Sequence, residues 1–349
     1  MLMIYRKMIR NNRKIRIILL IIALIFFLSV DIIKKISLKD SDIQGNKIEI
    51  LIPKGSSLVE IADILYNNGL ITDKDFFIMW ARLSGTEKKL QAGHFYVPEN
   101  LNSVQLATYL SQAKPAELYV TLIEGWDNYQ ITEQLSKSLG LNLRIMDSLC
   151  TDSTFCASFG INKRDLIGYL LPNTYAFNKG LSESEVLSIL VNRTLSIFDR
   201  DSVKQAMDEL NYSRDQILTL ASIVEGEAIF DDERATIAAV YLNRLKKGMR
   251  LQADPTIQFI IDGPPRRLLY KDLEIDSPYN TYRYYGLPPG PINNPGIKSI
   301  LATIFAEKVK YLYFVARGDG RHTFSNTLKE HNQAKLAFDK IRREVRRQR

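Results

Sequence analysis

The sequence contains few of the residues that build metal sites and disulfide scaffolds. Its 349 residues include only three histidines, His94, His322 and His331, and two cysteines, Cys150 and Cys156, with five residues between them. This excludes a His-rich metal cage and the CxxC type of zinc site, so no metal is expected. It leaves open whether the two thiols are free or form one local disulfide. The HExxH, GxSxG and Walker A motifs are also missing.

Positive charge is scarce in the body of the chain, although the formal net charge is +8. Residues 1–16 hold six Lys or Arg and no acid, and residues 340–349 contribute a net five positive charges. The segment from 17 to 339 therefore carries a net charge of −3. A broad basic surface for nucleic acid is excluded, and no nucleic-acid partner is expected.

A long uncharged run, IILLIIALIFFLSV, occupies residues 17–30. With the isoleucines around it, this run predicts a transmembrane helix over 17–36, because about 20 helical residues span a bilayer core of roughly 30 Å. The cations before it predict that residues 1–16 stay in the cytoplasm and that the rest is exported. A cleaved signal peptide is the alternative, but no A-x-A-like site follows the run. We therefore expect a single-pass anchor in the cell inner (cytoplasmic) membrane, with the rest of the chain periplasmic or extracytoplasmic.

Two folded regions are expected after a polar linker at 37–46, and both are of the α+β class. Alternating apolar residues, a Pro-Lys-Gly turn and amphipathic helices predict a compact module over 47–115. Short strands alternate with helices again in a larger domain over 116–349. The elements expected in the module are strands at 47–52 and 90–98 and helices from Leu58, from Asp73 and over 103–112. A weak similarity between 52–65 and 122–135 leaves an internal duplication open.

The segment after Ser213 predicts a helix that carries two glutamates. Ser213 and Gln216 form a capping box, and the apolar residues that follow share one helical face. Glu225 lies at one border of that face and Glu227 at the other, so the two cannot form one carboxylate dyad while the helix persists. Apolar neighbours would raise the pKa of Glu225 and favour a proton donor. A solvated border glutamate is the plainer alternative.

Residues 249–296 change in composition. They contain eight of the twelve prolines of the chain together with many tyrosines and asparagines. A long irregular segment inside a domain is usually functional or disordered, and disordered segments are poor in aromatics. Ring faces and amides suit a sugar polymer, although tyrosine-rich loops also bind proteins. After it we expect a helix at 297–306, a hairpin with a turn at 317–320, and a terminal helix capped by Thr327 and Glu330.

Five long motifs, in this order, resemble the endolytic murein transglycosylase (MltG, YceG-like) family. They are GYLLPNTY (168–175), LASIVEGEA (220–228), RATIAAVYLNRL with LQADPT (234–256), YNTYRYYGLPPGPINNPG (279–296), and the run from YFVA to GRHTFSNTLKEHNQA (313–334). The resemblance covers nearly the whole chain. It implies a membrane anchor, a small LysM-like module over 47–115 and an α+β catalytic domain over 116–349.

The resemblance implies that Glu225 is the catalytic acid and base of a lytic transglycosylase. Such an enzyme cleaves the β-1,4 bond between N-acetylmuramic acid and N-acetylglucosamine within nascent strands and leaves 1,6-anhydro ends, without a cofactor. It also implies a set of substrate-binding residues, whose individual roles stay open: Glu227, Gln252, Asp254, Asn280, Tyr282, His322 and Phe324. Asp254 is the clearest example, since it would orient Glu225, bind sugar, or cap the turn before Pro255.

Glycan strands of peptidoglycan are the expected partner. The family further implies a role in ending strand elongation beside penicillin-binding proteins or the elongation and division machinery. Two alternatives stay open. One is a non-catalytic peptidoglycan-binding or division scaffold. The other is a two-carboxylate muramidase, a hydrolase in which Asp254 or Glu227 assists Glu225.

Overall fold

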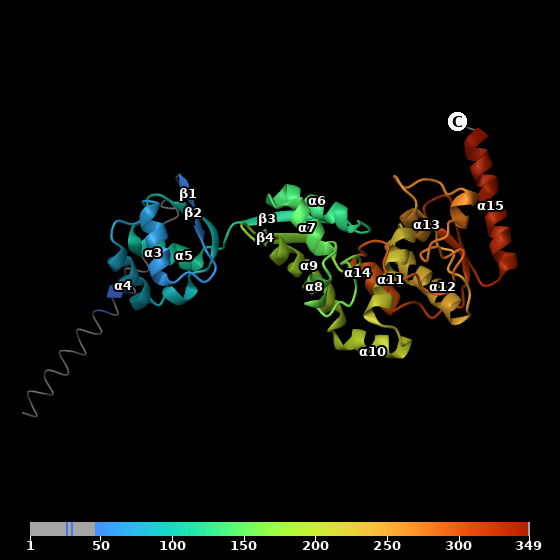
Figure 1. The fold of residues 1–349 in the computed structure, drawn as a ribbon, viewed down its shortest axis with the longest axis horizontal. Coiled ribbons are helices and arrows are strands. Elements are labelled where there is room, and N and C mark those ends of the chain that lie inside the picture. The colour runs from blue at the N-terminus through green and yellow to red at the C-terminus, as the bar shows by residue number, and fades with distance from the viewer. Residues whose placement is uncertain (1–25, 27–28, 31–45, 348–349) are drawn as a thin grey trace, which may run out of the picture. The chain divides into compact units, whose positions relative to one another are not determined.

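The computed structural model describes residues 26, 29–30 and 46–347. The chain divides into two compact units. Unit 1 comprises residues 1–118 and 178–180, and unit 2 comprises residues 119–177 and 181–349. Both contain helices and small sheets, so the predicted α+β class is confirmed (Figure 1).

Unit 1 is built on one antiparallel strand pair. In register, Ile50 faces Phe95 and Ile48 faces Val97, and the buried side chains on one face of the pair meet the helices. The capping box of Ser57 and Glu60 opens the first helix. The unit has its own hydrophobic core, which supports a separate module here, although its LysM-like assignment stays a prediction. Its elements are β1 (Lys47–Ile52), α3 (Leu58–Asn67), α4 (Lys74–Ser84), η1 (Glu87–Lys89), β2 (Gly93–Pro98) and α5 (Ser103–Gln112).

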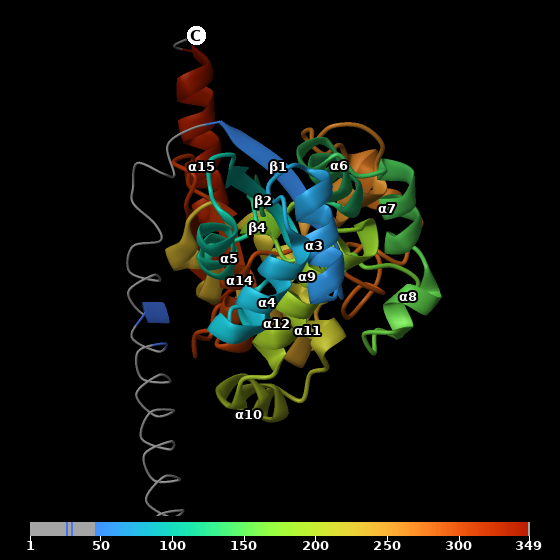
Figure 2. The same cartoon turned by 90° about the vertical axis from the view of Figure 1, so that its left-hand side faces the viewer.

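Unit 2 is mainly helical. Its first part runs through β3 (Glu117–Thr121), α6 (Asn128–Leu139), α7 (Leu143–Cys150), α8 (Ser153–Ala157), β4 (Thr174–Asn178), α9 (Glu183–Phe198) and α10 (Asp201–Leu210). Its second part runs through α11 (Arg214–Glu227), η2 (Asp231–Glu233), α12 (Arg234–Lys246), α13 (Asp254–Ile260), η3 (Tyr270–Glu274), α14 (Ile297–Ile304), β5 (Tyr313–Ala316), β6 (His322–Ser325) and α15 (Leu328–Arg347). Helix α15 is the red helix that ends near the label C in Figures 1 and 2.

Helix α11 holds the second unit together. It contacts α12, α13 and α14, and its residues belong to two hydrophobic clusters. Ile217, Leu218 and Ala221 pack with the first part of the unit, whereas Leu220 and Val224 pack with the second part. The C-terminal end of α11 is therefore fixed from several sides.

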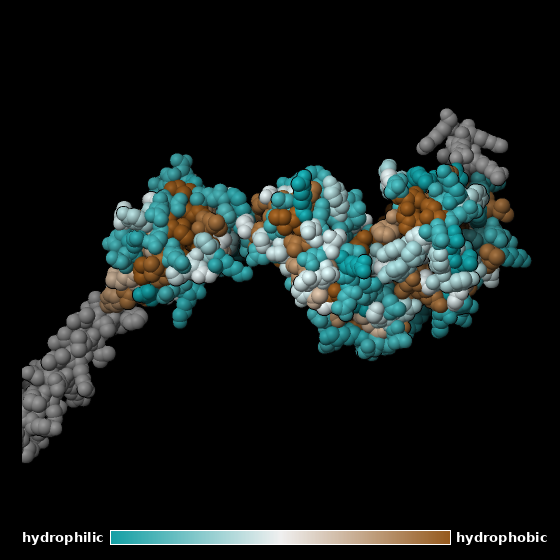
Figure 3. All heavy atoms as spheres, viewed as in Figure 1, coloured by the Kyte–Doolittle hydropathy of each residue, from teal (hydrophilic) through white to brown (hydrophobic). Residues whose placement is uncertain are grey.

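Hydrophilic residues cover most of the face that Figure 3 shows, and smaller apolar areas lie between them.

The structure adds elements that the sequence did not indicate. No strand was predicted at residues 174–178, but β4 forms there because it pairs with β3, which lies about fifty residues earlier. The proline-rich segment was expected to be irregular, but α13 begins at Asp254. Pro255 is compatible with a helix start, since its missing N–H would have no partner in the first turn. Helices α7 and α8 were also not expected.

The predicted membrane helix at 17–36 lies outside the described residues, except for Phe26, Ser29 and Val30. Within the part of the chain that the structure describes, no helix is long and apolar enough to cross a membrane. The two cysteines are buried free thiols. Burial raises the pKa of the Cys150 thiol to about 12.

Candidate active site

The helix that carries the two glutamates is buried along most of its length. Ser213 Oγ accepts from the Gln216 N–H, and Gln216 Oε1 accepts from the Ser213 N–H at 2.8 Å, so the predicted capping box is confirmed. Every residue from Ile217 to Val224 is buried. The sequence predicted only one buried face. The polar side is buried too. The hydroxyls of Thr219 and Ser222 are satisfied there because they donate to carbonyls of the same helix.

The carboxyl group of Glu225 lies at the end of this helix and is held at both oxygens. Arg234 Nη1 donates to Oε1 at 2.8 Å, and the backbone N–H of Gly296 donates to Oε2 at 2.9 Å. The side chains of Glu225 and Arg234 are 6% and 11% exposed. The guanidinium therefore balances the charge of a carboxyl that is largely removed from water, and the two donors fix its orientation. Each oxygen can still accept from a further partner.

Arg234 is itself held in place by other side chains. Its Nη1 also donates to Ser299 Oγ at 2.6 Å, and its Nε donates to Asp231 Oδ1 at 3.0 Å. Lys298 pairs with the other oxygen of Asp231. Arg234 is the first residue of α12 and Ser299 lies in the first turn of α14, so α11, α12 and α14 meet at Glu225. Arg234 and Ser299 were not among the predicted site residues; the available signal for Arg234 was that it opens one of the quoted motifs.

Two glycines let the backbone approach Glu225 closely. A Cβ on Gly296 would lie 3.3 Å from Glu225 Oε2 and 2.5 Å from Glu124 Cγ. Gly125 has a φ of +79°, and a Cβ there would lie 3.7 Å from Glu225 Cγ. Gly296 is required because a side chain there would collide with Glu124. Gly125 is required because its left-handed backbone conformation is unfavourable for other residues.

Two asparagines fix the segment that leads to Gly296. Asn294 is fully buried, and its Oδ1 accepts from the N–H groups of Gly168 and Leu170 at 2.8 and 3.1 Å. Its Nδ2 donates to the Trp126 carbonyl and to Asn128 Oδ1. Asn293 Nδ2 donates to the Ser222 carbonyl, one helical turn before Glu225. These bonds connect the GYL and NNPG motifs around the candidate catalytic group.

Glu227 contacts partners different from those of Glu225, in agreement with the predicted separation of the two carboxyls. The Tyr241 hydroxyl donates to Glu227 Oε1 at 2.7 Å. Burial raises the pKa of Glu227 to about 7, and the nearby carboxylate of Asp254 acts in the same direction. The Tyr241 hydrogen bond, the charge of Arg244 and the Asp254 backbone lower that pKa, but by less than burial raises it.

The remaining residues predicted in the 249–296 segment lie around α13. Asp254 accepts from the Tyr282 hydroxyl. Burial makes the largest contribution to the raised pKa of Tyr282, and the carboxylate of Asp254 raises it further. Gln252 is exposed, with a φ of +49°. Asn280 is fully buried: its Nδ2 donates to the carbonyls of Leu273 and Ile275, and its Oδ1 accepts from the Tyr282 N–H. In this conformation Asn280 shapes the loop without facing solvent.

His322 and Phe324 lie on β6 and face inward. Glu233 Oε2 lies 2.9 Å from His322 Nδ1, and its Oε1 accepts from the His322 backbone N–H at 3.0 Å. The His322 ring lies edge-on to Phe314, and Phe324 packs against the same phenylalanine. Glu233, which was not among the predicted site residues, immediately precedes Arg234. The hairpin is thereby connected to the residue that pairs with Glu225.

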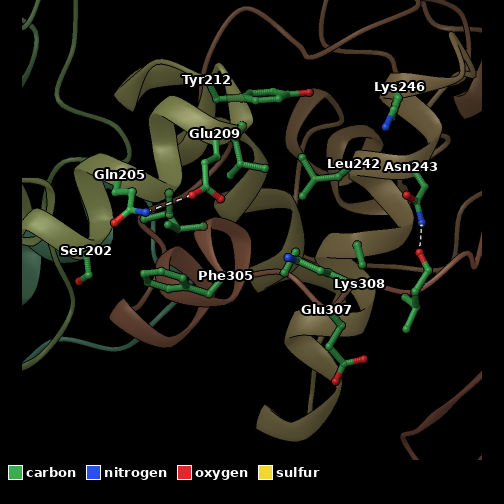
Figure 4. A pocket seen from close by; sticks show the side chains of 16 residues that line it. Ser202, Gln205, Glu209, Tyr212, Leu242, Asn243, Lys246, Phe305, Glu307 and Lys308 are labelled. Carbon is green, nitrogen blue, oxygen red and sulfur yellow. Dashed lines mark hydrogen bonds between the residues drawn. The ribbon is translucent and has the colours of Figure 1, made fainter.

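A large cavity of about 1,020 Å³ lies in another part of unit 2 (Figure 4). It is lined by α10, α12 and the segment after α14, and Glu225, Glu227 and Asp254 are not among its lining residues. Among the described residues, no group of three or more His, Cys, Asp or Glu side chains could hold a metal ion. Glu225 is thus a carboxyl that is nearly removed from water and held at both oxygens, and Glu227 is a partly buried carboxyl two residues later.

Comparison with known proteins identifies a consistent set of relatives. The model of the YceG-like family matches residues 50–337. An endolytic murein transglycosylase of Bacillus subtilis (strain 168) is 35% identical over 307 residues, which cover 83% of this chain and 84% of that protein. An endolytic murein transglycosylase of Streptococcus pneumoniae (strain D39) is 26% identical over 316 residues, which cover 81% of this chain but only 56% of that protein.

A solved structure shows the same fold. The crystal structure of a YceG-like protein from Listeria monocytogenes is 33% identical in sequence and superposes with a TM-score of 0.56. The match covers 82% of this chain and 98% of the Listeria chain.

Proposed function

The chain belongs to the YceG-like family, and from this premise we propose that it is an endolytic murein transglycosylase in which Glu225 is the catalytic acid and base. Its substrate is the glycan strand of peptidoglycan, and its product carries a 1,6-anhydro-muramic end. One observation carries the assignment of Glu225. Its carboxyl is buried at the end of a core helix, yet is fixed by Arg234 and the Gly296 N–H.

The proposed reaction uses this one carboxyl twice. Protonated Glu225 gives its proton to the glycosidic oxygen as the bond from that oxygen to C1 of N-acetylmuramic acid breaks. The carboxylate that results is balanced by Arg234. It then takes the proton from the C6 hydroxyl while O6 bonds to C1. The ring closes, the leaving sugar keeps the first proton, and Glu225 ends protonated as it began. No water is consumed.

The neighbouring carboxyls favour this mechanism over hydrolysis with two carboxylates. A hydrolase needs a second carboxylate that activates water or attacks C1. Glu227 accepts from Tyr241 in a partly buried position, and Asp254 accepts from Tyr282. Both candidates named for that role are therefore engaged with other residues, whereas the lytic route requires only Glu225.

We also propose a location and an arrangement for the enzyme. The cationic residues 1–16 and the apolar run at 17–36 support a single-pass anchor with the catalytic unit outside the cell inner membrane. The LysM-like module would bind the same polymer. Penicillin-binding proteins or other parts of the elongation or division machinery would supply the nascent strands that the enzyme cuts.

Digestion of purified peptidoglycan by the full chain, with mass spectrometry of the products, tests the proposal. The wild type should release fragments with 1,6-anhydro ends. Glu225→Gln should release none while it keeps a native circular-dichroism spectrum at the assay temperature, although loss of the charge that pairs with the buried Arg234 should lower its melting temperature. Glu209→Gln, an exposed glutamate of α10, is the matched control and should keep full activity.

Two results would replace the proposal with an alternative. Reducing ends in place of anhydro ends would identify a muramidase. Binding of murein without any cleavage by the wild type would favour a scaffold.

A further inference from the structure

Glu233 and His322 form a close pair that no step of the proposed reaction uses. Glu233 Oε2 lies 2.9 Å from His322 Nδ1, and Glu233 Oε1 accepts from the His322 backbone N–H at 3.0 Å. The side chains of Glu233 and His322 are 10% and 11% exposed. One carboxylate therefore holds both the ring and the backbone of the same residue, in a position that is largely removed from water.

Contacts on two sides connect this pair to the Glu225 site. Glu233 is followed directly by Arg234, whose guanidinium donates to Glu225. The His322 ring lies edge-on to Phe314, and Phe314 packs against the hydrophobic cluster that contains the last turns of α11. The pair therefore lies where the hairpin of β5 and β6 meets the two helices that carry Glu225 and its partner.

The carboxylate decides which nitrogen of the neutral His322 ring carries the proton. An ionised carboxylate only accepts hydrogen bonds, so the contact at Nδ1 requires a proton on that nitrogen. In the neutral ring, Nε2 then has a free lone pair. Within the described residues, no hydrogen bond engages Nε2, and Nε2 is not one of the buried polar atoms that lack a partner. It is therefore the ring nitrogen that is open to solvent.

We propose that Glu233 is a positioning residue that keeps His322 in the Nδ1–H tautomer, so that His322 Nε2 accepts a hydrogen bond from a sugar hydroxyl or acetamido N–H of the glycan. This rests on the proposed function, because it takes the glycan as the ligand of the site. His322 is one of the predicted substrate-binding residues, and its contact with substrate is now assigned to one atom and one direction of donation.

The variant Glu233→Gln separates the position of the His322 ring from its tautomer. The backbone N–H of His322 can only donate, so the amide oxygen of the new side chain has to face it. The amide nitrogen then faces Nδ1 and donates to it, which moves the ring proton to Nε2. Both hydrogen bonds of the pair are kept, and only the lone pair offered to the glycan is lost. A purely structural role of Glu233 would tolerate this change.

Binding of a soluble, uncrosslinked glycan strand to the full chain in detergent tests the proposal. It is measured in the Glu225→Gln background, so that cleavage does not interfere. Addition of Glu233→Gln should weaken binding about fivefold to tenfold, which corresponds to one hydrogen bond.

Asp232→Asn is the matched control. Asp232 is the neighbouring acid, it pairs with Arg321 of the same hairpin at 2.8 Å, and its side chain is 65% exposed. Because an exposed ion pair contributes little, this variant should change binding by less than about twofold.

Nitrogen-15 NMR of the histidine-labelled full chain reads the tautomer without any need for activity. The chain has only three histidines, and His322→Gln assigns the signal. At neutral pH the wild-type ring should be neutral with its proton on Nδ1, and in Glu233→Gln the proton should lie on Nε2.

A wild-type ring that carries a proton on Nε2 would overturn the inference. Undiminished binding by Glu233→Gln, or a tautomer that this variant leaves unchanged, would do the same. If the wild type makes anhydro ends while one of these results is found, this inference fails alone. If it makes none, the proposed function fails, and the binding and NMR results still decide the role of Glu233.

Discussion

The Nη1 atom of Arg234 lies 2.8 Å from Oε1 of Glu225, and both side chains are almost entirely removed from solvent. Such a pair is costly to bury, so its geometry has to be fixed by further bonds. Asp231 and Ser299 supply them. The arrangement places a permanent positive charge where the reaction would leave a carboxylate.

Replacement of Arg234 should therefore impair catalysis more than substrate binding. In Arg234→Lys the single ammonium cannot reach Glu225, Ser299 and Asp231 together, because it lacks the planar fork of the guanidinium. We expect kcat to fall about 10²-fold, with a smaller change in KM. Release of anhydro-muropeptides measures both. Arg317→Lys, an exposed arginine, should behave like the wild type; full activity of Arg234→Lys would contradict the role given to this pair.

A methyl group on Gly296 should displace the Glu225 carboxyl. The backbone of Gly296 has a φ of −69°, which alanine adopts freely, so any effect is steric. The new Cβ would lie 2.5 Å from Glu124 Cγ and 3.3 Å from Glu225 Oε2. Because a misplacement of about 1 Å can cost about 10²-fold in rate, Gly296→Ala should be strongly impaired. Glu124→Ala removes the closer atom, so the double variant should recover part of the rate. An equally inactive double variant would show that the contact with Glu124 is unimportant.

Local signals in the sequence predicted the individual elements well. The capping boxes at Ser213 and Thr327 correctly marked the starts of α11 and α15, because they depend on residues three apart. The alternation of apolar and polar residues over 47–52 predicted β1, because it too is a local pattern that depends on residues two apart. The strand β4 was not predicted, because its partner β3 is distant in sequence.

The candidate site was predictable only in part. Glu225 was selected from its motif and its border position, but its burial depends on α12 and α14, which pack against it from later in the chain. Arg234 and the Gly296 N–H were not predicted as its partners, since nothing local in the sequence brings them together. Asn280 was predicted to bind substrate because it matches a position in one of the family motifs. The structure occupies its amide with loop carbonyls, a use that composition does not reveal.

Removal of the Asn294 side chain should destabilise unit 2 strongly. Its amide pairs with Gly168, Leu170, Trp126 and Asn128, and all of these bonds are partly or fully buried. Asn294→Ala leaves at least two backbone N–H groups without a partner, at about 1–3 kcal/mol each. We expect the free energy of unfolding to fall by about 3 kcal/mol or more in urea denaturation. Asn68→Ala, an exposed amide in unit 1, should change it by less than about 1 kcal/mol, and a similar small loss for Asn294→Ala would disprove this role.

The raised pKa of Glu227 should make the stability of unit 2 depend on pH. Its pKa rises from 4.5, the ordinary value of a glutamate, to about 7 in the folded protein, so between these values the folded state binds more protons than the unfolded state. The contribution of Glu227 to stability is then greatest below about pH 4.5 and falls as pH rises toward 7, by about 3 kcal/mol at most. Glu227→Gln does not titrate, so the difference in unfolding free energy between the variant and the wild type should grow from pH 5 to pH 8. Urea denaturation of both proteins across this range measures it, and a constant difference would show that Glu227 is not protonated in the fold.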